Sequence, residues 1–141
     1  MTPLLDAMTR INWLAVLAAT FALTVLGGVW FTALFGRTYA TVLGRAYDPK
    51  AKPAPIFIVG PLVCSLITVI TSAILVKALN LSSTGDALLF GAVIGLGFLV
   101  STMANTAINP NMPRPLMYSL VSGPYFFLSG ILSSLILVRL S

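Results

Sequence analysis

Four long apolar runs dominate this chain of 141 residues and leave only short polar breaks between them. Each run is long enough to cross a bilayer, because a helix needs about 20 apolar residues to span roughly 30 Å of hydrocarbon. We therefore predict an all-α polytopic membrane protein, a single domain over residues 1–141 that folds as a bundle of four transmembrane helices. The predicted spans cover residues 12–36, 56–79, 85–108 and 116–138.

The charge pattern supports a membrane location. Only 8% of the residues are charged, against about 25% in soluble domains. The acids Asp6, Asp48 and Asp86 lie at or beyond the ends of the apolar runs. A net charge of +5 would suggest nucleic-acid binding in a soluble chain. Here the basic residues flank the spans, so we expect membrane lipids rather than nucleic acid as partners.

The distribution of Lys and Arg also indicates an orientation, because these residues accumulate on the cytoplasmic side of short loops. The first and third connections carry five of them and the opposite side carries three. This difference favours both termini outside and the long first connection in the cytoplasm. The two sets are Arg37, Arg45, Lys50, Lys52 and Arg114 against Arg10, Lys77 and Arg139.

The first connection has a helical pattern of its own within residues 37–47. Four of its residues recur at i, i+3, i+4 and i+7, which predicts one apolar face of a short helix in the headgroup region. These residues are Tyr39, Val42, Leu43 and Ala46. The Asp-Pro pair at 48–49 would end such a helix. The alternative is an irregular loop in which the spacing arose by chance.

The residues that most enzymes use are missing. The chain has no histidine or glutamate, no pair of carboxylates within reach of each other and no metal-ligand cluster. We therefore expect no enzymatic activity, no cofactor and no metal. The single cysteine, Cys64, lies in the second run and is interpreted as a small packing residue.

Small residues in the third and fourth runs predict close helix contacts. The spacing resembles the small-xxx-small pattern that lets two backbones approach each other in a membrane. The predicted packing positions are Gly91, Gly95, Gly123 and Gly130. The same faces could join two copies, so a homo-oligomer, or a place as a subunit of a larger membrane complex, is expected.

A polar stripe follows the end of the third run, where Thr102, Asn105, Thr106 and Asn109 share one helical face. Its amides need partners in hydrocarbon. The stripe is therefore either hydrogen-bonding glue between helices or part of a ligand site. Its candidate partners are Ser65, Thr68 and Ser72 of the second run and Thr20 and Thr24 of the first.

The inferred topology brings four residues to the cytoplasmic side of the bundle. Trp30, Asn105, Arg114 and Tyr118 are therefore our candidate site for a ligand or a partner. A guanidinium beside aromatic rings suits an anionic headgroup or a partner's helix end. Anchoring at the membrane interface is the competing explanation for the Trp and Tyr residues.

Several short motifs resemble the domain-of-unknown-function 1761 family across nearly the whole chain. They are Ile11-Asn12-Trp13-Leu14-Ala15, Gly27-Gly28-Val29-Trp30, Leu34-Phe35-Gly36-Arg37, Gly97-Phe98, Arg114-Pro115 and Ser122-Gly123-Pro124-Tyr125. Tyr39 stands where the family pattern has Trp, and Pro124 interrupts the pattern of small residues and Tyr. The resemblance implies a small multi-pass protein of the bacterial inner membrane and highlights Asn12, Trp13, Trp30, Asn105 and Arg114. It implies no reaction.

Two classes of function remain. The first is a non-catalytic membrane protein, either a structural or accessory subunit or a lipid-binding protein. The alternative is a small transporter or channel that acts as a homo-oligomer. Proton-coupled exporters need an ionisable group inside the membrane, and the acids here lie at the ends of the runs, so the first class is favoured.

Overall fold

The computed structural model describes residues 2–141, which form helices joined by loops. Four helical segments are long and apolar enough to cross a membrane, and this confirms the predicted all-α fold class. The candidate spans are Trp13–Leu34, Ile56–Ala78, Thr84–Ala107 and Pro115–Arg139. Each end lies within two residues of the end predicted from the apolar runs.

Two of the spans change their helical winding along their length. In the first, α2 (Trp13–Gly28) continues as the π-helix η1 (Val29–Leu34). In the third, α5 (Thr84–Ile94) passes through the π-helix η2 (Gly95–Val100) into α6 (Ser101–Ala107). The other two spans are the α-helices α4 (Ile56–Ala78) and α7 (Pro115–Arg139). π-helical segments are rare in proteins, and those that do occur often lie at functional sites.

Local sequence signals set several helix ends. The Asn12 side-chain oxygen accepts the backbone N–H groups of Leu14 and Ala15 and so begins α2. Ser83 and Asp86 form a reciprocal capping box at the start of α5. At the end of α4, Asn80 adopts a left-handed φ of 54°, a conformation that asparagine tolerates better than most residues.

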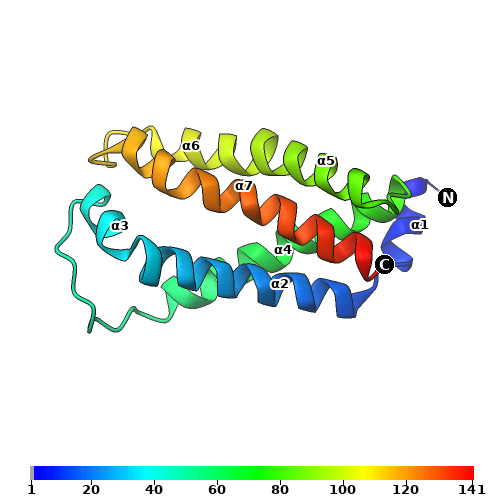
Figure 1. Cartoon of the computed structure of the whole chain (residues 1–141), viewed down its shortest axis with the longest axis horizontal. Helices are drawn as coiled ribbons and strands as arrows, with labels where there is room; N and C mark the ends of the chain where they lie inside the picture. The colour runs from blue at the N-terminus through cyan, green and yellow to red at the C-terminus, as the bar shows by residue number, and fades with distance from the viewer. Residues whose placement is uncertain (1) are drawn as a thin grey trace.

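In the bundle, α7 lies between the other three spans and packs against each of them (Figure 1). The α5–α6 span covers one side of α7, and α2 and α4 cover the other. We call the end that carries both termini the terminal end, and the end that carries the connections 43–55 and 108–114 the loop end.

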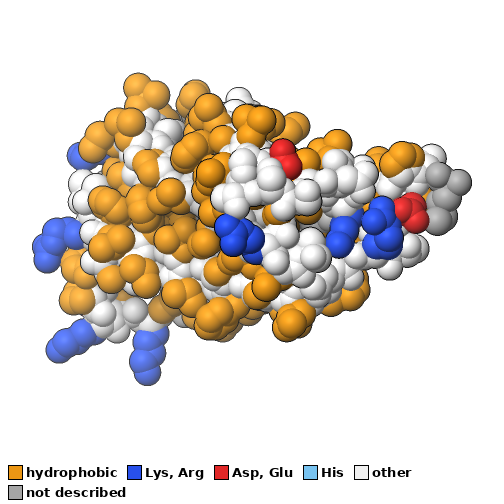
Figure 2. All heavy atoms as spheres, turned by 45° about the vertical axis from the view of Figure 1, so that its right-hand side comes forward, with side chains coloured by type: hydrophobic (Ala, Val, Ile, Leu, Met, Phe, Trp, Pro, Cys, Tyr) orange, Lys and Arg blue, Asp and Glu red, His pale blue; other side chains and the backbone are white. Residues whose placement is uncertain are grey.

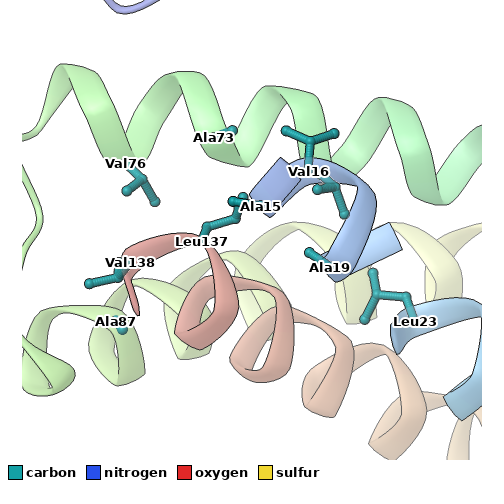
Figure 3. Packing of buried hydrophobic residues seen from close by; sticks show 10 residues of the cluster. Ala15, Val16, Ala19, Leu23, Ala73, Val76, Ala87, Leu137 and Val138 are labelled. Carbon is teal, nitrogen blue, oxygen red and sulfur yellow. The ribbon is translucent and has the colours of Figure 1, made fainter. Parts of the chain in front are cut away.

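The close-packed core lies toward the terminal end, where small side chains from all four spans meet (Figure 3). Leu137 of α7 lies beside Ala15 of α2, and Ala73 and Val76 of α4 close the cluster. Toward the loop end, the first turns of α4 are exposed on almost every side. The bundle is therefore tight at the terminal end and more open at the loop end.

The flank of the bundle suits lipid contact. Figure 2 shows a broad band of hydrophobic side chains with Lys and Arg gathered at the ends. Leu14, Phe21 and Leu120 are each 71% exposed. An apolar surface of this extent is typical of a protein that faces a membrane.

Two short helices lie outside the spans. The apolar runs do not predict α1 (Pro3–Thr9), although Thr2 caps it and Pro3 and Asp6 are typical of a first helical turn. Ala7 of α1 is fully buried, and the helix packs against α4. The described residues thus include one more helix at the terminal end than the apolar runs indicated.

The predicted helix in the first connection is present but shorter than expected. It is α3 (Gly36–Val42), and it packs against η1 and α7 with Val42 fully buried. Gly44, rather than the Asp-Pro pair at 48–49, ends it. Gly44 has a φ of 72°, and the Arg45 N–H donates to the Ala40 carbonyl at 3.0 Å, which together form a Schellman end.

Candidate functional site

The third and fourth spans touch each other at backbone distance. A Cβ atom on Gly91 would lie 2.7 Å from the Gly130 carbonyl oxygen, and one on Gly95 would lie 2.8 Å from the Phe127 carbonyl oxygen. Only glycine allows such an approach without displacing a helix. We call this crossing of Gly91 and Gly95 with Gly130 the glycine contact. Because it lies within one chain, these faces are not open to a second copy.

From the glycine contact toward the loop end, α6 and α7 pack less closely. A Cβ atom on Gly123, the fourth predicted packing glycine, would meet only side-chain atoms of Met103 and Val100 at 3.8 Å. An open groove of about 460 Å³ lies here between η2, α6 and α7. Its walls are formed by Phe98, Leu99, Thr102, Met103, Thr106, Ala107, Asn109, Met112, Tyr118 and Phe126.

The groove changes character along its length. The part of the groove nearer the middle of the bundle is lined by Phe98, Leu99 and Phe126. The part nearer the loop end is lined by Asn109 and Tyr118. Its volume falls within the range of about 300–1,000 Å³ that is usual for small-molecule pockets. Methionine side chains adapt readily to ligands of varied shape, and two of them are in the lining.

Aromatic side chains join the groove to the first span and to α3. The ring of Tyr118 lies 5.9 Å from that of Tyr39 on α3, and Tyr39 lies 4.7 Å from Phe31 of η1. Phe31 in turn lies 5.0 Å from Tyr125 of α7. Such ring pairs each contribute about 0.5–1.5 kcal/mol beyond their buried area. They hold α3 against the loop end of α7.

Burial raises the pKa of Tyr39 to about 12. The neighbouring Tyr118 hydroxyl contributes to this rise in the pKa through its charge and through a hydrogen bond, and Arg45 opposes it. Tyr39 therefore stays neutral at physiological pH. Its hydroxyl is available as a hydrogen-bonding group beside Tyr118, at the loop end of the groove.

The structure places the four residues of the predicted site at different positions. Tyr118 lines the groove. The Trp30 indole N–H donates to the Val121 carbonyl at 3.0 Å and so fastens the first span to the fourth. Arg114 is exposed immediately before α7. Asn105 is exposed on α6, whereas Met103 and Ala107 of that helix are buried.

The polar stripe on the third span bonds within its own segment. The Thr106 hydroxyl donates to the Thr102 carbonyl at 2.9 Å, and the Asn109 amide donates to the Thr106 carbonyl at 2.7 Å. Thr20, one of the expected partners, lies in the core and donates to the Val16 carbonyl at 2.8 Å. The stripe does not, therefore, act as glue to the first span.

The sequence analysis did not single out Met103, Met112 or Phe126, which line the groove. Their helical spacing is that of any apolar span. The separation of α6 from α7 depends on where the glycine contact falls, and this is a three-dimensional property.

Four candidate spans, three of them packed around the fourth, and an apolar flank define a multi-pass membrane protein. The chain matches the family model described as "Protein of unknown function (DUF1761)" over residues 14–138, so it belongs to this family, as its motifs indicated. No curated protein and no solved structure matches the chain.

Proposed function

We propose that this protein is a non-catalytic binder of a membrane lipid or a closely similar amphiphile, which it holds in the groove between α6 and α7. The groove is the observation that carries this proposal. Its inner walls are apolar, and its amide and phenol groups lie toward the loop end. An acyl chain directed toward the middle of the bundle, with a polar headgroup at the loop end, matches this gradient.

The chemistry of the lining favours binding over the alternatives. The residues that form it include no carboxylate, thiol or basic side chain, and Tyr118 is their one ionisable group. General acid–base catalysis and proton-coupled transport both need ionisable groups at the site. A neutral groove that opens to the flank of the bundle supports the retention of a lipid-like ligand.

The proposal is tested by filling the groove. Thr106→Trp places an indole in the lining, so we expect it to reduce the amount of lipid that stays bound when the protein is extracted in mild detergent. Native mass spectrometry measures the fraction of molecules that carry a lipid adduct. The ligand and the indole compete for the same volume, so that fraction should fall severalfold.

The matched control is Asn105→Trp, because Asn105 is the neighbouring residue and is exposed outside the lining. This variant should retain lipid as the wild type does. Equal retention by the wild type and both variants would contradict the groove as the binding site. Equal loss in both variants would also contradict it, because it would make Asn105 as important as the groove wall.

A further inference from the structure

Two arginines that are far apart in the sequence flank a single contact at the loop end. Gly44, which ends α3, lies against Pro113 at the start of the fourth span, and a Cβ atom on Gly44 would be 3.2 Å from the Pro113 Cγ atom. Arg45 directly follows Gly44, and Arg114 directly follows Pro113. The contact at Gly44 therefore places Arg45 of the first connection and Arg114 of the third next to two residues that touch.

This position adjoins the polar end of the groove. The Arg114 carbonyl accepts the Tyr118 N–H at 2.9 Å in the first turn of α7, so the two residues are one turn apart. Tyr118 lines the groove and stacks near Tyr39 of the helix that Arg45 follows. Tyr118 and Asn109 thus line the loop end of the groove, Tyr39 lies beside Tyr118, and Arg45 and Arg114 belong to the segments that carry these tyrosines.

The positive charge here has no carboxylate partner within the described residues 2–141. The one ion pair found there joins Arg10 to Asp6 at 2.7 Å, at the terminal end. The acid of the loop end, Asp48, accepts the backbone N–H of Lys50 at 2.9 Å. Arg45 and Arg114 are both exposed. Two exposed cations at one end of a bundle, with no acid paired to them, favour the binding of an anion.

We propose that Arg45 and Arg114 recognise the anionic headgroup of a phospholipid whose acyl chain occupies the groove. This inference rests on the proposed function and adds the chemical class of the ligand. Arginine suits the role because its planar, forked donors match phosphate oxygens. Tyr39 and Tyr118 add neutral hydrogen-bonding groups beside the charged pair.

The positive-inside rule also accounts for cations on a cytoplasmic loop, but it makes a different prediction. If topology were their whole role, each basic residue of the loop end would be equivalent. The proposed headgroup site requires Arg45 and Arg114 to matter more than Lys52, which lies on the same connection as Arg45 but is not adjacent in the sequence to Gly44 or Pro113.

The experiment compares Arg45→Gln, Arg114→Gln and Lys52→Gln, which each remove one charge from the same end. Each intact protein is placed in nanodiscs of phosphatidylcholine and phosphatidylglycerol, and native mass spectrometry measures which lipid stays bound. We expect the wild type to select phosphatidylglycerol. The selectivity of each arginine variant should be roughly tenfold lower than that of the wild type, because a charge-assisted hydrogen bond is lost. Lys52→Gln should keep the selectivity of the wild type. Arg45→Lys should restore part of it.

Further outcomes separate this proposal from the proposed function. Wild-type lipid adducts without a preference for phosphatidylglycerol would overturn the headgroup site and leave the groove intact. Equal losses of selectivity in the Lys52 and arginine variants would overturn it. They would show that the basic residues of the loop end attract anionic lipid without a specific site. If the Thr106→Trp variant kept its phosphatidylglycerol adducts, the anion site would be independent of the groove. This result would contradict the proposal. If the protein bound inorganic phosphate in pure phosphatidylcholine discs and showed no lipid selectivity, the ligand of the arginines would be a free anion and not a lipid.

Discussion

At the scale of single residues, periodicity identifies which side chains share a helical face but not where that face points. The spacing predicts one stripe of Thr102, Asn105, Thr106 and Asn109, yet Asn105 is the member of the four that does not line the groove. Trp30 was selected for its depth, and the structure adds a specific bond to the Val121 carbonyl. The partner of a side chain depends on helix packing, which one sequence does not specify.

The Trp30 bond yields a prediction about stability. Trp30→Phe keeps an aromatic ring but removes the indole donor. The half-buried Val121 carbonyl then loses a partner, at a cost of about 0.5–1.5 kcal/mol. Thermal unfolding in detergent should show a lower Tm for this variant, whereas Trp13→Phe, at an exposed position, should leave the Tm close to that of the wild type. Equal Tm values for both variants and the wild type would show that the indole bond contributes nothing.

The raised pKa of Tyr39 yields a prediction about pH. An ordinary tyrosine ionises near pH 10, and Tyr39 has a pKa of about 12 in the folded protein. Because the neutral form is favoured in the fold, its contribution to stability is present below pH 10 and is lost as the pH rises from about 10 to 12. Ultraviolet difference titration of the wild type against Tyr39→Phe should show that this phenol ionises late. A difference signal centred near pH 10 would contradict its burial against Tyr118.

At the scale of helices, apolar length was sufficient to predict the four spans, because crossing a membrane imposes a strict minimum length. The winding within a span was not predictable in this way. The groove begins in η2, beyond the glycine contact, where α6 and α7 pack less closely. The short helix α1 had legible capping signals but lacked the apolar run on which the prediction relied.

The glycine contact is tested by two alanine substitutions within η2. A Cβ atom on Gly95 would lie 2.8 Å from the Phe127 carbonyl oxygen, whereas one on Gly97 meets nothing within 4 Å. Gly95→Ala should therefore destabilise the protein by about 1–3 kcal/mol, the usual cost of overpacking. Gly97→Ala should be neutral or slightly stabilising, because alanine favours helix. Thermal unfolding of both variants measures this difference in stability. Equal changes in Tm for the two variants would contradict the close crossing.

At the scale of the whole molecule, the loop end combines the more open part of the bundle with five of the eight basic residues. The count of Lys and Arg predicts that this end faces the cytoplasm. The tight core lies at the terminal end and holds the four spans together there. A binding groove at the open end can therefore exist without disturbing the core.

The orientation can be measured by labelling single cysteines with an impermeant thiol reagent, after Cys64 has been replaced by serine. Position 50 lies in the first connection and position 141 at the C-terminus. We expect Lys50→Cys to be labelled only in opened cells and Ser141→Cys to be labelled in intact cells. The reverse pattern would invert the orientation without changing the number of spans.

Our proposal places a membrane amphiphile in the groove between α6 and α7. Photo-crosslinking in membranes with a phospholipid that carries a diazirine on its acyl chain tests it most directly, with the attachment sites mapped by peptide mass spectrometry. We expect crosslinks concentrated on Leu99, Met103 and Phe126, and their loss in Thr106→Trp but not in Asn105→Trp. Crosslinks spread evenly over the exposed faces of all four spans, and unaffected by either substitution, would contradict it.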